Sequence, residues 1–263
     1  MIETIDIKQI ITVAKEAGKA IMEIYAKDFN VEFKADESPL TEADKAANAI
    51  ICERLEALYP AIPILSEENK AADFSERKNW EYLWVIDPLD GTKEFIKKNG
   101  EFTVNIALVH NDTPVLGVVY APAMDVTYYA KKGNGAFKVE NGQSQKLPII
   151  TNTAPEKKLT VVASRSHLSP ETEVFIDALR SQTESVDMTS IGSSLKLCLV
   201  AEGSADYYPR LAPTMEWDTA AAQAVVLESG KRVFRYEEGK VLQNMEPVVY
   251  NKANLLNPWF IVH

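Results

Sequence analysis

Two carboxylates, a glycine and a hydroxyl lie close together in the segment Asp87–Thr92. The apolar run before Asp87 predicts a buried strand, and Pro88 ends regular pairing because it cannot donate a ladder hydrogen bond. Gly91 allows close backbone approach, and Thr92 is expected to open a short helix whose free amides favour an anion. Paired carboxylates beside an anion site make chemical sense when hard cations lie between them.

Three further acidic positions fall at predicted element ends: Glu67 with Glu68 after a strand, and Asp44 and Asp218 at helix starts. Each has a plain alternative: a solvated acidic loop, a capping acid, and an acid that complements the helix dipole. The Asp87–Thr92 segment could likewise be a surface turn. The four clusters together still favour one site, because strand C-termini of α/β sheets share a rim where ligands bind.

Other hydrolytic chemistries lack their motifs. The three histidines form no HExxH pair, and no GxSxG is present. No Gly-Lys pair precedes Ser or Thr as a P-loop requires, and neither cysteine has the downstream Arg of a thiolate phosphatase. The acids Asp87 and Asp90 are three residues apart rather than the two of a phosphoaspartate hydrolase. The chemistry must therefore depend on carboxylates and on the species that these carboxylates bind.

Composition describes an ordinary folded protein of 263 residues, 46% apolar and 25% charged. The net charge of −10 disfavours nucleic-acid binding. The first ten residues lack the basic region of a secretory signal, and no apolar run is long enough to span a membrane. Cys52 and Cys198 are expected to be free, buried thiols in a reducing, cytoplasmic compartment.

Periodicity predicts the elements that position these residues. Helices are expected over 5–25 and 41–59, buried strands at 62–65 and 82–86, and an antiparallel meander over 101–130, with turns following it. After residue 152, strand and helix alternate, with helices at 170–180, 193–203 and 217–229. Two domains are therefore predicted: 1–152, α+β with the antiparallel sheet and the Asp87–Thr92 motif, and 153–263, α/β.

The strings ADKAAN, SEE, DPLDGTKEF, GSSLKLCLVAEGSADYYPR and PTMEWDTAAAQAVVLESG together resemble the inositol monophosphatase superfamily of Mg²⁺-dependent, lithium-sensitive phosphatases. The match runs from about residue 36 to 230, in family order and spacing. Inositol phosphatases usually carry Asn-Phe after DPIDGT. Lys93-Glu94-Phe95, the SSLKLC segment and the YPR segment ending at Arg210 instead favour the 3'(2'),5'-bisphosphate nucleotidase branch of the bacterial CysQ type. The resemblance implies an α+β / α/β fold, a layered αβαβα sandwich of the sugar-phosphatase type.

The resemblance also implies roles for individual residues. One Mg²⁺ would be held by Glu67, Asp87 and the Leu89 carbonyl, a second by Asp87, Asp90 and Asp218, and relatives hold a third near Glu67. The catalytic residues would be Asp44, Glu67 and Thr92, with the Thr92 hydroxyl, fixed by Asp44, orienting a metal-activated water. Domain 153–263 would complete the metal site and bind the nucleotide.

The implied substrate-binding residues span both domains: Glu67, Leu89, Asp90, Gly91, Thr92, Ser193, Lys196, Arg210 and Asp218. The amides of Gly91 and Thr92 would receive the scissile phosphate. Ser193, Lys196 and Arg210, with His167 nearby, would hold a remote phosphate. Taken alone, the first three could instead be a helix cap, a solvated lysine and a surface arginine.

The expected reaction is hydrolysis of the 3'-phosphate of 3'-phosphoadenosine 5'-phosphate, a by-product of sulfate activation, to AMP and phosphate. The alternative is an inositol monophosphatase or broader sugar phosphatase with the same metal site. A non-catalytic metal-binding regulator would need a broken site, whereas every expected ligand is present. The expected partner is the nucleotide bisphosphate substrate, and no nucleic acid is expected. The protein is expected to be a monomer or a homodimer. Its expected location is the cytoplasm, or the inner face of the cell membrane as a peripheral protein.

Overall fold

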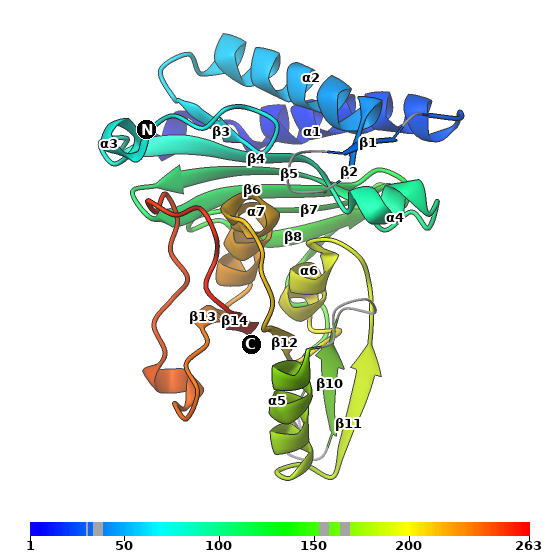
Figure 1. Cartoon of the computed structure of the whole chain (residues 1–263), viewed down its shortest axis with the longest axis vertical. Helices are drawn as coiled ribbons and strands as arrows, with labels where there is room; N and C mark the ends of the chain where they lie inside the picture. The colour runs from blue at the N-terminus through cyan, green and yellow to red at the C-terminus, as the bar shows by residue number, and fades with distance from the viewer. Residues whose placement is uncertain (30, 34–38, 153–157, 164–168) are drawn as a thin grey trace.

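A seven-stranded sheet forms the centre of the computed structural model, which describes residues 1–29, 31–33, 39–152, 158–163 and 169–263 (Figure 1). Its strands lie in the order β3-β4-β5-β6-β7-β8-β9. The first two, β3 and β4, are parallel and all later neighbours are antiparallel. The strands are β3 (Ile64–Ser66), β4 (Tyr82–Asp90), β5 (Thr103–His110), β6 (Thr113–Ala121), β7 (Val126–Lys131), β8 (Gly135–Glu140) and β9 (Gln143–Lys146).

Two long helices, α1 (Ile7–Tyr25) and α2 (Glu42–Leu58), cover one face of this sheet (Figure 1). The Asp6 carboxylate caps α1, so the helix predicted over 5–25 is confirmed with a start two residues later. Thr41 and Asp44 form the predicted capping box of α2. A short antiparallel pair, β1 (Val31–Phe33) and β2 (Pro39–Thr41), precedes it.

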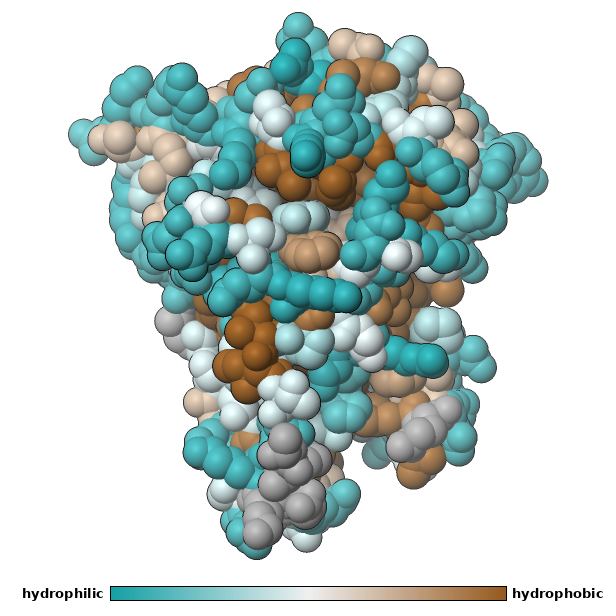
Figure 2. All heavy atoms as spheres, turned by 180° about the vertical axis from the view of Figure 1, so that it is seen from behind, coloured by the Kyte–Doolittle hydropathy of each residue, from teal (hydrophilic) through white to brown (hydrophobic). Residues whose placement is uncertain are grey.

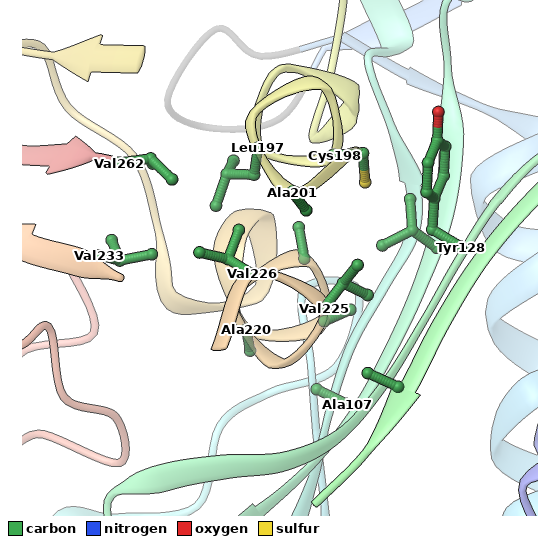
Figure 3. Packing of buried hydrophobic residues seen from close by; sticks show 14 of the residues in the cluster. Ala107, Tyr128, Leu197, Cys198, Ala201, Ala220, Val225, Val226, Val233 and Val262 are labelled. Atoms are coloured by element: carbon green, nitrogen blue, oxygen red, sulfur yellow. The ribbon is translucent and has the colours of Figure 1, made fainter. Parts of the chain in front are cut away.

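Helices α6 (Leu195–Glu202) and α7 (Glu216–Glu228) cover the opposite face (Figures 1 and 3). Figure 3 shows Cys198 of α6 and Val225 of α7 pointing into the packed apolar layer beside the sheet residues Ala107 and Tyr128. Cys198 is fully buried, which confirms a packed core thiol, whereas Cys52 is only partly buried.

Smaller sheets and one helix complete the sandwich. Strand β10 (Lys158–Val162) pairs in parallel with β11 (Ser185–Thr189), and β12 (Tyr208–Arg210), β14 (Phe260–Val262) and β13 (Val233–Arg235) pair antiparallel in that order. Helix α5 (Pro170–Arg180) packs against β11 and β12. The expected αβαβα layering and all three helices predicted in the second half are confirmed. The remaining short helical segments are η1 (Ile2–Thr4), α3 (Phe74–Arg77), α4 (Thr92–Ile96) and η2 (Leu242–Asn244).

One apolar core crosses the predicted domain boundary. Its buried residues include Val85 and Ala107 from the central sheet together with Val162 and Val225 from the second half. A second core lies between α1, α2 and the other sheet face. The division at residue 152 therefore stays a prediction, and the two parts share a continuous packed layer.

Two details differ from expectation. Strand β4 continues past Pro88 to Asp90, although its pairing with β5 is interrupted after Asp87 and resumes only at Asp90 opposite Thr103. Pro88 has no amide hydrogen to donate, which explains why the pairing is interrupted. The strand nevertheless does not end there, because it pairs again at Asp90. The turns expected after residue 130 are present, and β8 and β9 flank them because hairpin partners extend the meander.

The outer surface in Figure 2 is mostly hydrophilic, with apolar side chains gathered in separate areas between polar ones. None of the helices among the described residues combines the length and apolar character needed to cross a bilayer.

Candidate active site

The irregular end of β4 brings two carboxylates out of a buried strand. Asp87, 1% exposed, lies opposite Asn105 of β5 and accepts a hydrogen bond from the Leu89 amide at 3.0 Å. The pairing then skips two residues before Asp90 rejoins the ladder. A bulge of this kind re-aims side chains at a sheet rim, so both carboxylates face the same end of the sheet.

Gly91 makes the turn from β4 into α4 at a φ of +93°. A Cβ there would be strained and would lie 3.1 Å from the Glu101 carbonyl oxygen. The glycine therefore permits both the left-handed turn and the close approach of the neighbouring backbone, as the sequence indicated.

Asp44 performs both tasks that the sequence left open. Its Oδ2 accepts hydrogen bonds from the Thr41 amide (2.8 Å) and hydroxyl (2.6 Å), which is the capping role. Its Oδ1 accepts from the Thr92 hydroxyl at 3.2 Å. The same hydroxyl lies 3.4 Å from the Leu89 carbonyl oxygen. The contact with Asp44 is the shorter of the two and its acceptor is a carboxylate, so it is the stronger influence on the direction of the Thr92 hydroxyl.

Glu67 and Asp218 reach the site from different elements. Glu67 follows β3, where its amide donates to the Ile86 carbonyl at 3.1 Å and so holds it beside the end of β4. Asp218 lies in the first turn of α7, and its Oδ2 accepts from the Met215 amide at 2.8 Å. As with Asp44, the carboxylate caps its helix and also faces the shared site.

The carboxylates act on one another electrostatically. Burial, followed by the charges of Glu67, Asp90, Asp218 and Asp44, raises the pKa of Asp87 well above its ordinary value. Burial and the charge of Asp90 raise the pKa of Asp218 to about 8. Burial also raises the pKa of Asp90, against the opposing effects of the Lys196 charge and the Ser194 amide. Four sequence-distant elements therefore converge on a site crowded with negative charge.

This crowding fits a divalent cation. All the main influences on Asp87 disfavour its charged form, and a hard cation with oxygen ligands is the species that would reverse them. The donors are carboxylates and carbonyls, which suit Mg²⁺. Within the described residues, no three acidic, His or Cys side chains already stand at ligand spacing around one point. The ligand sets and the number of ions remain predictions.

A cavity of about 150 Å³ is lined by both halves of the chain and includes the carboxylates of Asp90 and Asp218. The predicted residues Gly91, Ser193, Lys196 and Arg210 all line it, together with Lys93, Glu94, Ser194, Leu197, Tyr208, Thr214, Thr219 and Phe260. The carboxylates of Asp90 and Asp218 and a cationic wall formed by Lys196 and Arg210 thus border one small space.

Lys196 is buried, which contradicts the alternative of a solvated lysine. It is 8% exposed, and its Nζ donates to the carbonyls of Ser193 (2.7 Å) and Ile191 (3.3 Å). Burial lowers its pKa to about 8, although the charge of Asp90 opposes this. Near neutral pH it therefore remains a cation aimed at the cavity.

Ser193 and Arg210 also have polar atoms directed inward. The residue before α6 is Ser194, so Ser193 is not the helix cap. Its buried Oγ has no hydrogen-bond partner among the described residues, and neither has the Arg210 Nε. Arg210 donates through Nη2 to the Pro213 carbonyl at 3.0 Å. His167 lies outside the described residues.

Sequence reasoning missed several residues that support the site. Asn105 donates to Asp90 at 3.4 Å, and its position opposite Asp87 on the neighbouring strand was a usable signal. Glu101 accepts from the Gly192 amide at 2.7 Å, a contact across 91 residues of sequence that no local pattern reveals. Lys93 and Glu94 were noted in the motif but received no role.

Comparison with known proteins agrees with this geometry. The model of the inositol monophosphatase family matches residues 4–260. The chain belongs to the inositol monophosphatase family. It is 46% identical over 258 residues to the 3'(2'),5'-bisphosphate nucleotidase CysQ of Salmonella typhimurium, covering 97% of this chain and 98% of that protein. The CysQ of Escherichia coli K12 is 46% identical over 257 residues, with the same coverage of both chains.

Among solved structures, the crystal structure of CysQ from Bacteroides thetaiotaomicron aligns with a TM-score of 0.85 and 46% identity, covering 98% of this chain and 96% of that one. Membership in the inositol monophosphatase family agrees with the layered fold and the carboxylate rim described above. The family's phosphatases depend on a divalent metal, generally Mg²⁺.

Proposed function

We propose that this protein is a Mg²⁺-dependent phosphatase that hydrolyses the 3'-phosphate of 3'-phosphoadenosine 5'-phosphate to AMP and phosphate. One observation carries the proposal: the cavity joins a rim of carboxylates to a wall with Lys196 and Arg210. A substrate with two separated phosphates needs both a cation site for the phosphate that leaves and cationic side chains for the one that stays. The near full-length similarity to the CysQ nucleotidases supports the same activity.

At the reacting end, Glu67, Asp87, the Leu89 carbonyl, Asp90 and Asp218 would hold two Mg²⁺, and Glu67 would border a third. When bound, these ions neutralise the phosphate and lower the pKa of the attacking water. Asp44 accepts a hydrogen bond from the Thr92 hydroxyl. This hydroxyl would position the water for in-line attack rather than remove its proton alone. The amides of Gly91 and Thr92 would receive the phosphate at the start of α4.

At the other end, Ser193, Lys196 and Arg210 would bind the 5'-phosphate. The hydroxyl of Ser193 and the Nε of Arg210, which have no hydrogen-bond partner in the described part of the chain, are donors that a phosphate oxygen would satisfy. Glu67, Leu89, Asp90, Gly91, Thr92 and Asp218 would contact the phosphate that is removed. We also propose a cytoplasmic location for the enzyme, because free Cys52 and Cys198 suit a reducing compartment.

A paired phosphate-release assay tests the proposal. At matched Mg²⁺, the purified protein should release phosphate from 3'-phosphoadenosine 5'-phosphate much faster than from inositol 1-phosphate, and EDTA or Li⁺ should suppress both. A pocket that binds an uncharged polyol would instead favour inositol 1-phosphate. A preference of tenfold or more for that substrate would reject the nucleotidase assignment. An Asp90→Asn variant that stays folded but loses turnover would support the metal role.

A further inference from the structure

The residues Ile191–Ser194, here called the recognition loop, shape the cationic wall of the cavity. The loop presents the Ser193 hydroxyl, and its carbonyls at Ile191 and Ser193 hold the Lys196 ammonium in place. The position of this loop therefore determines where the Ser193 hydroxyl and the Lys196 ammonium lie relative to Asp90. Its conformation is a determinant of what the cavity can bind.

The recognition loop does not adopt this conformation by local preference. Ser193 has a φ of +49°, in the left-handed region that costs a residue with a side chain about 1–2 kcal/mol. Gly192 leaves no room for change, because a Cβ there would lie 2.5 Å from the Glu101 carbonyl oxygen and 2.8 Å from the Glu94 Cγ. Contacts outside the loop must hold the strained arrangement.

Four contacts with the first half of the chain do so, one of which joins the hydroxyls of Ser194 and Thr103 at 2.9 Å. The Ser194 amide donates to the Asp90 carboxylate at 2.6 Å, and the Ser194 hydroxyl donates to the Asn105 side-chain oxygen at 2.9 Å. The Gly192 amide donates to the Glu101 carboxylate at 2.7 Å. Asp90 belongs to the proposed metal site and Asn105 donates to Asp90. Glu101, just before β5, is the carboxylate anchor outside the metal ligand set.

We propose that Glu101 is a positioning residue that sets selectivity for a substrate with a second phosphate. By holding the Gly192 amide, it fixes the recognition loop so that Ser193 and Lys196 face the 5'-phosphate. Glu101 is not among the described residues that line the cavity. This inference rests on the proposed nucleotidase function and adds a residue to it.

The test compares two substrates that differ only in the 5'-phosphate: 3'-phosphoadenosine 5'-phosphate and adenosine 3'-phosphate. For Glu101→Ala with Mg²⁺ present, we expect kcat/KM to fall about tenfold or more for the bisphosphate, or about 1.4 kcal/mol. The loss should appear in KM. For adenosine 3'-phosphate, kcat/KM should change less than about twofold, because that substrate leaves the loop unused.

Two further variants separate position from charge. Glu101→Gln keeps an oxygen that can accept from Gly192 and should retain most of the selectivity. Glu101→Asp keeps the charge but shortens the reach, so it should lose selectivity in part, and it also serves if Glu101→Ala folds poorly. The matched control is Glu228→Ala, because Glu228 accepts from the amides of Gly133 and Gly135 at 2.9 Å at the far end of α7.

Calorimetric titration with adenosine 5'-phosphate gives a readout without turnover. Its Kd for the Mg²⁺-loaded Glu101→Ala variant should rise about tenfold, while the affinity for adenosine should not change. Equal losses on both substrates, or wild-type selectivity in Glu101→Ala and Glu101→Asp, would overturn the inference. If the wild-type protein itself does not hydrolyse the bisphosphate, the proposed function fails instead, so the two failures are distinguishable.

Discussion

At the scale of single residues, Thr92 shows how a weak group gains a defined role. Its hydroxyl points to the Asp44 carboxylate, which is itself fixed by two hydrogen bonds from Thr41. A hydroxyl held in this way presents its lone pairs in one direction. This chain of contacts therefore links the N-terminus of α2 to Thr92, the first residue of α4.

Replacing Thr92 by Val should separate orientation from folding. The shape is preserved and the hydroxyl is lost, so kcat should fall about 10²-fold or more, as expected when a positioned proton-relay group is removed. Thr92→Ser should keep most of the activity because the hydroxyl remains. The measurement is kcat for phosphate release, together with the urea unfolding midpoint. Wild-type kcat in Thr92→Val would exclude the orienting role.

Lys196 provides a pH prediction at the same scale. Burial lowers its pKa to about 8, so the free enzyme loses this cation as pH rises through that value. We expect kcat/KM for 3'-phosphoadenosine 5'-phosphate to decline across that range, because kcat/KM reports the ionisation of the free enzyme. Adenosine 3'-phosphate should show a much smaller decline. Identical profiles for the two substrates would remove Lys196 from 5'-phosphate binding.

At the scale of elements, α7 positions Asp218 by lying directly on the central sheet. A Cβ added at Gly117 of β6 would lie 2.1 Å from the Ala221 carbonyl oxygen and 2.9 Å from the Ala224 Cβ. The glycine is what permits this close contact between helix and strand. Any shift of α7 would move its first turn, which carries Asp218.

Gly117→Ala should therefore reduce both stability and activity. Overpacking of this kind costs about 1–3 kcal/mol in the free energy of unfolding, because backbone and not a flexible side chain must move. The control is Ser144→Ala on the exposed edge strand β9, with an expected change within about 0.5 kcal/mol. Urea unfolding gives the energies and phosphate release the activity. A Gly117→Ala protein with wild-type stability would mean that α7 can shift freely.

The N-terminus of α7 also makes hydrogen bonds with the segment that contains Asn251 and Lys252. Glu216 is fully buried and accepts from the amides of Asn251 (2.7 Å) and Lys252 (3.0 Å) and from the Lys252 ammonium (2.6 Å). Asn251 in turn accepts from Arg77 at 2.8 Å. Three distant segments therefore meet two residues before Asp218.

Glu216→Ala should destabilise the protein by about 3 kcal/mol, because it leaves buried donors without their charged acceptor. The loss should be seen as a lower urea midpoint with an unchanged slope. Lys240→Ala is a suitable control, since its ion pair with Glu237 is exposed. A loss no larger than that of Lys240→Ala would show that the other contacts suffice to hold the segment.

At the scale of the whole molecule, local patterns predicted the elements and the motif but not the contacts between distant parts. Apolar spacing predicted α1, the capping residues Thr41 and Asp44 predicted α2, and the alternation of strand and helix patterns predicted α5, α6 and α7. The convergence of Asp44, Glu67, Asp87 and Asp218 was foreseen only through strand topology and family resemblance. Glu101 and Glu216 could not be foreseen, because their partners lie 91 and 35 residues away and no periodicity links them.

The carboxylate rim also links the stability of the whole molecule to pH and to Mg²⁺. The pKa of Asp218 is about 8 in the folded protein, above its ordinary value of 3.8, so between these values the folded state binds more protons than the unfolded state. The free energy of unfolding in EDTA should therefore fall as pH rises from about 5 to 8. Without a bound cation, ionisation of these buried carboxylates destabilises the folded state, because the negative charges repel one another.

Mg²⁺ should reverse this loss, because a ligand of the folded state alone stabilises it by mass action. We expect Mg²⁺ to raise the thermal midpoint by several degrees at pH 8 and by less at pH 5, where protons compete for the same carboxylates. Asp218→Asn, which imitates the protonated acid, should flatten the pH dependence in EDTA and weaken the response to Mg²⁺. Differential scanning calorimetry of the wild type and of Asp218→Asn, at pH 5 and at pH 8, measures the shift of the thermal midpoint that Mg²⁺ causes in each case. If Mg²⁺ shifts the midpoint of the variant as much as that of the wild type, Asp218 is not part of the metal site.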